Sequence, residues 1–251
     1  SPTVPTRPST RMRSTYCHPE SPTMRLAKPH LDIGLFTNDI TSHRAFWSET
    51  VGLRLDHELD FGNGTIQHRY DAHDSVIKIN HFPDPFELQA PSGYTGLTIA
   101  RMGAAAWEGT HPGGERVRLV PPGTNGVIGI GITVSTPDPA RMMDFYLNAM
   151  EFEKAGSRVA RCGDSLLFVE EGPGGVETED FVGPNFRYLT VQIFDADEAC
   201  DQIVGRGGRL SRTPVTLGKI ARYGFVCDPD GNWIEISARA SLTGIIPPPD
   251  A

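Results

Sequence analysis

Two stretches of the chain decide its fold: His30–Leu53 reads HLDIGLFTNDITSHRAFWSETVGL, and Gly129–Phe152 reads GIGITVSTPDPARMMDFYLNAMEF. The second stretch follows the first at an offset of 99 residues without a gap, so that Phe46 falls on Phe145. Each stretch predicts a short alternating strand, a loop with an aspartate and an amphipathic helix. The chain therefore contains an internal duplication.

Two further matches extend this duplication. Gly96–Ile99 (GLTI) corresponds to Tyr188–Val191 (YLTV) at an offset of 92 residues. His111–Leu119 (HPGGERVRL) corresponds to Asp228–Ile236 (DPDGNWIEI) at an offset of 117 residues. The difference of 25 residues means that about one helix with its loops is missing from the first copy. In the second copy, Ala196–Arg206 predicts this helix, and two glycines end it.

The duplication predicts an α+β fold built from tandem modules, each a strand, a helix and three strands (βαβββ). We expect two domains, at residues 28–122 and 126–240, each forming a mixed β cup. The proline- and glycine-rich segment Pro121–Gly126 (PPGTNG) is the predicted linker. Residues 1–27 are expected to be an extended N-terminal arm, and residues 241–251 a C-terminal tail.

The composition narrows the class of protein. With 38% hydrophobic and 22% charged residues, the chain has the balance of a globular protein, and its net charge of −8 disfavours nucleic acid or an anionic membrane as partner. No apolar run approaches the roughly 20 residues of a spanning helix. The four cysteines lack zinc-site spacing and indicate a reducing, cytoplasmic location. We expect the arm to pack on the rest of the chain or on a neighbouring subunit, and the arm together with the C-terminal IIPPPD tail predicts a homodimer.

The closing motif Asp228–Glu235 (DPDGNWIE), together with the duplication, resembles the vicinal-oxygen-chelate superfamily of glyoxalases, bleomycin-resistance proteins and extradiol dioxygenases. Its turn needs a glycine free to take positive φ at Gly231 and leads into a strand that aims Glu235 at a pocket. The resemblance implies the glyoxalase-like fold over nearly all of residues 28–240. It also implies a pocket in each domain, which in most relatives holds a divalent cation.

The resemblance further implies four pocket-facing positions per domain, on the first, fourth, fifth and eighth strands, where relatives carry His, Gln or Glu. Here these positions hold few metal ligands, which predicts that no metal cofactor is bound, because cations repel a metal ion and one carboxylate does not make a site. A divalent metal ion in a rearranged site, drawing on His30, His68, His81 or Glu235, remains an alternative. The positions are His30, Lys78, Gly96 and Arg118 in the first domain, and Gly129, Phe168, Tyr188 and Glu235 in the second.

The two-residue period of strands adds neighbours to these positions. Asp32 is expected on the face of His30, and Asn80 on the face of Lys78. In one hairpin register His68 lies opposite Lys78, and in the other register His68 turns outward. A Lys78 ammonium that faces inward needs either a counter-charge, for which Asp32 is the candidate, or a ligand. The remaining histidines, His43, His57, His73 and His111, are expected on helix or loop surfaces.

Three functions are compatible with this pattern. The first is a metal-independent lyase or isomerase that transfers protons on a small, oxygenated anionic compound. Its catalytic residues would be His30, His68 and Lys78, and its substrate-binding residues Asp32, Asn80, Arg118, Tyr188 and Glu235. The second is a noncatalytic binding or resistance protein with an aromatic-lined groove. The third is a divalent-metal lyase or dioxygenase with a rearranged site. We expect the first domain to carry the function.

Overall fold

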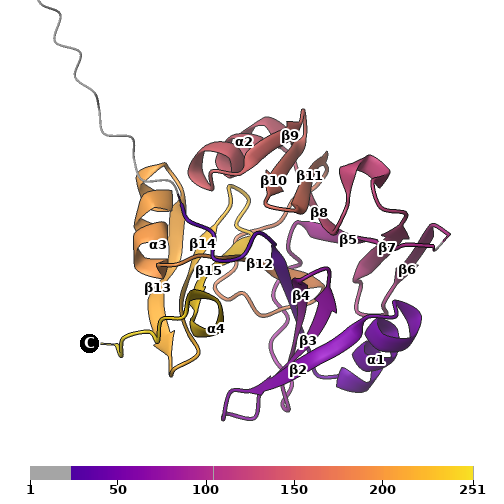
Figure 1. Ribbon diagram of the computed structural model, residues 1–251, viewed down its shortest axis with the longest axis horizontal. Coiled ribbons are helices and arrows are strands. Elements are labelled where there is room, and N and C mark those ends of the chain that lie inside the picture. Colours follow the sequence, from indigo (N-terminus) through magenta and orange to yellow (C-terminus); the bar gives the residue numbers. More distant parts are fainter. Residues whose placement is uncertain (1–23, 104, 251) are drawn as a thin grey trace, which may run out of the picture.

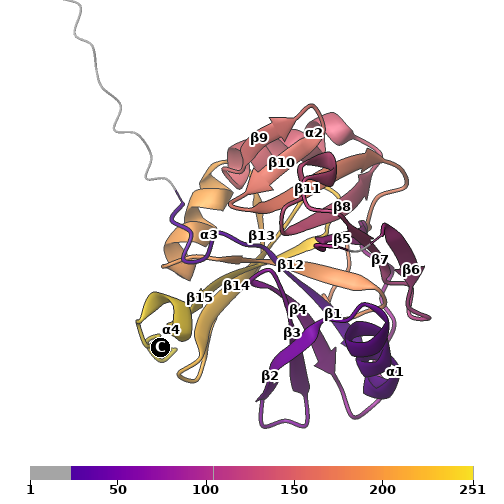
Figure 2. The same ribbon diagram turned by 45° about the vertical axis from the view of Figure 1, so that its right-hand side comes forward.

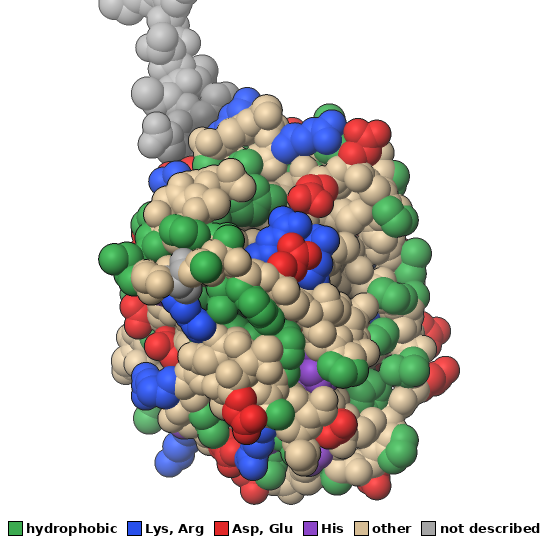
Figure 3. Space-filling view, turned by 90° about the vertical axis from the view of Figure 1, so that its right-hand side faces the viewer, with side chains coloured by type: hydrophobic (Ala, Val, Ile, Leu, Met, Phe, Trp, Pro, Cys, Tyr) green, Lys and Arg blue, Asp and Glu red, His purple; other side chains and the backbone are tan. Residues whose placement is uncertain are grey.

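The computed structural model describes residues 24–103 and 105–250, and Figure 1 shows how its strands and helices are arranged. Most of the predicted N-terminal arm, residues 1–23, lies outside the described part of the chain. Among the described residues, no helix is both long and apolar enough to cross a membrane. On the face nearest β6 and α1, acidic and basic side chains are interspersed with apolar ones (Figure 3).

The first half of the chain contains one complete module and one shortened module. Among the described residues the second module lacks both the helix and one of the four strands, so the shortening inferred from the offsets is confirmed and includes a strand as well as the helix. The complete module comprises β1 (Asp32–Thr37), α1 (Ile40–Arg44) continued by the π-helical turn η1 (Ala45–Thr50), β2 (Arg54–Asp60), β3 (Ile66–Ala72) and β4 (Ser75–His81). The shortened module comprises β5 (Tyr94–Ala100), β6 (Trp107–Thr110) and β7 (Arg116–Val120).

The second half repeats this order after the short 3-10 turn η2 (Thr124–Gly126), and here both modules are complete. Its first module comprises β8 (Ile130–Thr136), α2 (Pro139–Asp144), the π-helical turn η3 (Phe145–Ala149), β9 (Glu153–Gly156), β10 (Val159–Cys162) and β11 (Ser165–Glu171). Its second module comprises β12 (Phe186–Gln192), α3 (Ala196–Gly205), β13 (Arg209–Leu217), β14 (Ala221–Cys227) and β15 (Trp233–Arg239), followed by α4 (Ala240–Thr243).

The aspartate of each repeated loop explains where the helices begin. Asp39, Asp138 and Asp195 precede α1, α2 and α3, and the side chain of each accepts a hydrogen bond from a backbone N–H in the first turn. Such an N-cap satisfies an amide that has no partner within the helix. The same short signal therefore sets the start of three helices in three modules.

The modules assemble into two mixed sheets, and each sheet takes strands from both halves of the chain (Figures 1 and 2). The eight-stranded sheet has the order β13-β14-β15-β12-β1-β4-β3-β2, and the seven-stranded sheet has the order β6-β7-β5-β8-β11-β10-β9. The α+β fold of tandem modules is confirmed. The expectation that each sequence domain forms its own cup is wrong, because the first module pairs with the fourth and the second with the third.

The junction of the eight-stranded sheet is the antiparallel pairing of β1 with β12. Alternate residues of β1 face opposite sides: Ile33 and Leu35 enter the main hydrophobic core, whereas Phe36 lines a cavity. Between them, a Cβ atom at Gly34 would lie 2.1 Å from the ring of Tyr188 on β12. Position 34 therefore requires glycine, because the tyrosine ring occupies the space above it.

The pairing of the two halves predicts that neither half folds alone as a monomer. Residues 24–122 and 123–250, produced separately, should lack slow amide hydrogen exchange, because each would expose the strand edges and apolar surface that the other half covers. Co-expressed halves should assemble into a protected complex. A monomeric first half that unfolds cooperatively would contradict this prediction, and the intact chain provides the control.

Candidate functional site

The eight-stranded sheet curves around a cavity of about 300 Å³. Both halves of the chain contribute to its walls, since the cavity lies across the β1–β12 junction. The polar side chains that line it come from the loop before β3 and from β3, β4, β12 and β15, and they are Asn63, Thr65, Gln67, Arg69, Lys78, Asn80, Gln192, Glu235, Ser237 and Arg239. We refer to this cavity as the open cup.

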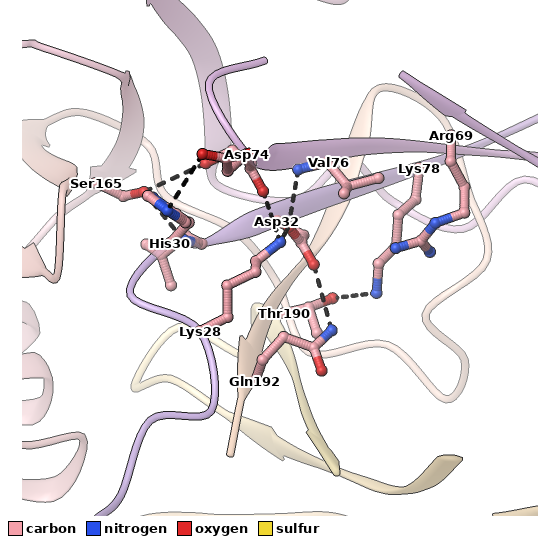
Figure 4. Close-up of polar contacts among 12 residues, drawn as sticks. Lys28, His30, Asp32, Arg69, Asp74, Val76, Lys78, Ser165, Thr190 and Gln192 are labelled. Atoms are coloured by element: carbon pink, nitrogen blue, oxygen red, sulfur yellow. Dashed lines mark hydrogen bonds and ion pairs between the residues drawn. The ribbon is translucent and has the colours of Figure 1, made fainter. Parts of the chain in front are cut away.

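At the base of the open cup, Lys78 forms a buried ion pair with Glu235. The Lys78 Nζ atom lies 2.7 Å from Glu235 Oε2 and 2.7 Å from Thr190 Oγ1, and the Thr190 hydroxyl donates to the same Glu235 oxygen at 2.6 Å. Figure 4 shows Lys78 reaching Thr190 beside Arg69. Only 4% of the Lys78 side chain and 14% of the Glu235 side chain are exposed. Burial lowers the pKa of Lys78, and the charges of Glu235 and Asp32 oppose this effect.

Asp32 is not the partner of Lys78. Its carboxylate accepts hydrogen bonds from Lys28 Nζ at 2.5 Å, from the Val76 backbone N–H at 2.8 Å and from Gln192 Nε2 at 3.3 Å, as Figure 4 shows. Burial alone would raise the pKa of Asp32, but the ammonium groups of Lys28 and Lys78 lower it below its ordinary value. The carboxylate is therefore ionised and already neutralised by Lys28.

The donor set at the base of the open cup does not fit a divalent metal ion. Among the described residues that line the cavity, Glu235 carries the only carboxylate, and the Lys78 ammonium lies against it; a charged lysine is a donor with no lone pair. On β1, Gly34 has no side chain that could bind a metal ion, and the Asp32 carboxylate is already bound by Lys28. A cation would have to displace Lys78 and be held by too few ligands.

Asn80 was expected in the pocket and lies there. It accepts from Gln67 Nε2 at 2.9 Å, and its own amide group donates to the Leu35 carbonyl and to the Tyr188 hydroxyl, both within 3.0 Å. Burial raises the pKa of Tyr188, so this hydroxyl stays neutral. These bonds hold the side walls of the cup in one arrangement, since the side chains of Gln67, Asn80 and Tyr188 are linked to one another.

Aromatic rings form the opposite wall of the open cup. Phe181 stacks on Phe225 with a centroid distance of 4.5 Å, and Phe36 stacks on Phe82 at 5.5 Å. The cavity thus combines an aromatic wall with charged groups, a combination typical of pockets that bind small organic molecules. The apolar lining comprises Phe36, Leu59, Phe61, Phe82, Phe181, Tyr188, Leu217, Ile220, Ala221, Tyr223 and Phe225.

Two of the expected catalytic histidines lie outside the open cup. His30 precedes β1 and faces Asp74 and Asp164, 4.0 Å and 3.9 Å from their carboxylates. His68 lies opposite Ile79, not Lys78, and its Nδ1 atom is 2.8 Å from Glu58 Oε1. The observed register is therefore the one that turns His68 away from the cup, and the role of these histidines as acid or base at Lys78 is wrong.

The expected anion ligand Arg118 also lies elsewhere. It is on β7 of the seven-stranded sheet, where its Nε atom donates to Glu108 at 2.6 Å in a largely exposed pair. Sequence reasoning placed Arg118 in the pocket and missed Arg69 and Arg239, which line it. Arg69 follows His68 in the same strand, so the hairpin register that sent His68 outward brought Arg69 inward, opposite Lys78.

The corresponding cup of the seven-stranded sheet is nearly filled. Its cavity is only about 130 Å³, and a Cβ atom at Gly131 would lie 2.6 Å from the ring of Phe168. Phe168 therefore occupies the position that the resemblance assigns to a ligand. The open cup is the better candidate site, and it joins Lys78 and Asn80 from the first half to Tyr188 and Glu235 from the second.

A second cluster of titratable groups lies between α1 and the β6–β7 turn. His43, His111 and Glu115 are buried, with ligand-type atoms within 4.8 Å of one another. The expectation that His43 and His111 lie on the surface is wrong. Their nitrogens are engaged: Trp47 donates to His43 Nδ1 at 3.3 Å, and His111 Nδ1 meets the Gly113 N–H and the Glu115 carboxyl, each at 2.9 Å.

The second half contains the same turn with different residues. Asp228 accepts from the backbone N–H of Asp230 and from the side chain of Asn232, in the positions that His111 and Glu115 occupy in the first half. The cluster therefore acts as the internal bracing of a turn. Burial and the neighbouring His111 lower the pKa of His43 to about 3, so His43 is neutral near physiological pH.

Residues 130–236 match the family model described as the Glyoxalase/Bleomycin resistance protein/Dioxygenase superfamily. A glyoxalase I variant from Zea mays is similar in structure, with a TM-score of 0.65 and 12% identity over 89% of this chain and 96% of that one. A putative dioxygenase from Bacillus subtilis has a TM-score of 0.61 and 15% identity over 90% and 86% of the chains. No curated protein sequence matches. At these identities the structural likeness establishes the fold alone.

The geometry of the open cup predicts that no stoichiometric transition metal is bound there. Elemental analysis of protein purified without chelators should find far less than one equivalent of zinc, iron, manganese or nickel. Adding each metal should leave the melting temperature unchanged, since binding would otherwise stabilise the folded state. If about one equivalent of metal is found and substitution of Glu235 removes it, the assignment is contradicted. If substitution of His43 removes it, the metal is bound by the cluster at the β6–β7 turn.

The neutral state of His43 predicts acid destabilisation. Its folded pKa of about 3 lies below the unfolded value near 6.5, so the unfolded chain binds the extra proton as the pH falls. Stability is therefore lost as pH decreases from about 6.5, by about 2 kcal/mol between pH 7 and pH 5.

A His43→Gln variant keeps an acceptor for Trp47. Its free energy of unfolding in urea should fall between pH 7 and pH 5 by about 2 kcal/mol less than that of the wild-type protein. His68, whose pKa is also lowered by burial, remains in the variant, so some of the pH dependence should persist. An unchanged dependence in His43→Gln would show that this residue is protonated as readily in the folded chain as in the unfolded one.

Proposed function

We propose that the open cup takes up a small oxygenated organic molecule without a metal ion, in a chain whose residues 130–236 match the glyoxalase superfamily model and most of whose length has that fold. The Lys78 ammonium performs the part of the cation by binding an oxygen atom of the ligand. The single observation that carries this proposal is the buried Lys78–Glu235–Thr190 cluster at the base of an aromatic cavity.

The hydrogen-bonding capacity of Lys78 supports this role. An ammonium group has three N–H donors, and two of them are used by Glu235 and Thr190. Since Lys78 lines the cavity, its third donor is available to a carbonyl or other oxygen of a ligand. A charge-assisted hydrogen bond in such a shielded place contributes about 1.5–3 kcal/mol.

The aromatic wall supports uptake of a largely apolar body. Phe36, Phe82, Phe181 and Phe225 present ring faces and edges around one end of a cavity of about 300 Å³, the lower end of the range for small-molecule sites. Aromatic rings of a ligand would pack on these side chains at offset or edge-to-face angles. Binding of an organic ligand is thus supported by the wall and by the base of the cup together.

A second candidate function is proton transfer next to a carbonyl group, which the free oxygen of Glu235 favours. Glu235 Oε2 holds Lys78 and Thr190, whereas no hydrogen bond to Oε1 is found among the described residues. A ligand carbonyl bound to Lys78 would bring its α-carbon near this carboxylate. Glu235 could then remove a proton while Lys78 stabilises the developing enolate oxygen. None of the described residues that line the cavity is a histidine, so this pair replaces the histidines expected from sequence.

The proposal predicts that a ketone binds more tightly than its hydrocarbon analogue, and that Lys78 causes the difference. We expect acetonaphthone to bind wild-type protein about tenfold more tightly than ethylnaphthalene, because only the ketone accepts the third Lys78 N–H. In Lys78→Met, which keeps most of the apolar volume, the two affinities should become equal. Tryptophan fluorescence or calorimetric titration would measure them.

Lys154→Met is the matched control, since Lys154 is exposed on β9 in the other sheet, and its ketone preference should equal that of wild type. Lys78→Met should also lower the free energy of unfolding by about 1–3 kcal/mol, because Glu235 keeps only the Thr190 hydroxyl as its donor. The double variant with Glu235→Gln should recover part of this loss. An unchanged ketone preference in Lys78→Met would refute the role of Lys78.

The proton-transfer candidate has its own test with the same ketone. In deuterium oxide, wild-type protein should accelerate exchange of the acetonaphthone methyl protons, followed by nuclear magnetic resonance. Glu235→Gln should abolish the acceleration, since an amide is not a base at neutral pH. Bound ketone without accelerated exchange would identify a binding protein and reject catalysis of this kind.

A further inference from the structure

Arg69 is a buried arginine that has no carboxylate partner within the part of the chain that the structure describes. Only 4% of the residue is exposed, and it lines the open cup from β3, opposite Lys78 in the hairpin. Its Nη1 atom donates to Gln67 Oε1 at 2.5 Å, whereas its Nε atom has no hydrogen-bond partner among the described residues. A buried guanidinium donor left in this state is costly unless something else satisfies it.

Arg239 lies at the end of β15 and lines the same cavity. Its Nε atom donates to Ser241 Oγ at 3.0 Å, and within residues 24–103 and 105–250 it forms no ion pair. Burial and the charge of Arg69 lower the pKa of Arg239 to about 10, so the Arg239 guanidinium remains charged near neutral pH. Two cations thus face a shared space where an anion would relieve their repulsion.

These two arginines lie where two cavities meet. Arg69, Gln192 and Arg239 line the aromatic open cup and also a second cavity of about 470 Å³ on the side of Lys28 and His30. Asp32 is held by Lys28 and Glu235 by Lys78, and the aspartates that line the second cavity, Asp56, Asp71 and Asp74, lie against Arg54, His57 and His30. Among the described residues, no carboxylate lies within ion-pair distance of Arg69 or Arg239, so both guanidinium groups are left for an anion.

We infer that Arg69 and Arg239 form an oxyanion subsite, so that the ligand of the open cup is an organic anion with an aromatic or bulky apolar body. Its carboxylate, or an equivalent oxyanion, lies between the two guanidinium groups, and its apolar body lies among the rings near Phe181. This inference rests on the proposed function and adds the charge of the ligand to it. Guanidinium groups are suited to the subsite because they bind oxyanions through paired N–H donors.

A matched pair of fluorescent probes tests the subsite. Anilinonaphthalene sulfonate and phenylnaphthylamine share an aromatic body, and only the former carries an oxyanion. Wild-type protein should bind the sulfonate about tenfold more tightly than the neutral probe, and added salt should weaken only the sulfonate. Arg239→Gln should lower the sulfonate affinity about tenfold and leave the neutral probe within about twofold.

Three variants make the result decisive. If circular dichroism shows that Arg69→Gln is folded, this variant should lower the sulfonate affinity as Arg239→Gln does. If Arg69→Gln is not folded, the result of Arg239→Gln alone decides the test. Arg118→Gln, an exposed arginine of the other sheet, is the control that should change neither affinity. Phe181→Ala should weaken both probes, because it removes an aromatic wall of the cup.

The outcomes separate the two proposals. Equal affinity for both probes in wild type and Arg239→Gln, with both weakened by Phe181→Ala, would overturn the oxyanion subsite and leave uptake by the open cup standing. Binding of neither probe, or binding that Phe181→Ala does not alter, would overturn uptake of an aromatic ligand in the open cup and the subsite with it.

Discussion

The antiparallel pairing of β1 with β12 is the constraint on which the rest of the structure depends. It joins the first module to the fourth, so Lys78 and Glu235, which are 157 residues apart in sequence, meet at 2.7 Å. The pairing also needs Gly34, because the Tyr188 ring fills the place of any side chain there. If the halves had folded separately, Lys78 would lack Glu235, and an unpaired buried ammonium would not remain charged.

The buried ion pair is more informative about function than about stability. Removing Lys78 and Glu235 from water costs about as much as their attraction returns, and apolar residues of similar size would often be as stabilising. A pair that contributes little net stability, yet lies at the base of an aromatic cavity with one N–H and one carboxylate oxygen to spare, is better explained by contact with a ligand. The same pair also removes the only cavity-lining carboxylate from any metal ion.

The sequence predicted the elements well because their signals are local. Strand alternation, the capping aspartates and the glycine-ended helix each depend on neighbours within a few residues, and the structure contains every module in the predicted order. The composition of the site was harder to predict, since it depends on register and on which module pairs with which. A shift of one residue in the β3–β4 hairpin exchanges His68 for Arg69 in the cup. Tyr188 and Glu235 were expected in a different pocket from Lys78, and the structure places all three around one cavity.

The missing helix shows how duplication let the two cups diverge. In the second half, α3 packs against β13, β14 and β15, so the absent helix of the first half would have covered β5 to β7 in the seven-stranded sheet. The loss therefore lies in the sheet whose cup Phe168 fills, and it does not open the cup that holds Lys78. The seven-stranded sheet lacks this helix and has the smaller cavity. The eight-stranded sheet has its full set of helices and strands, and its cavity contains Lys78 and Glu235. Because both sheets share a single hydrophobic core, the closed one still stabilises the open one.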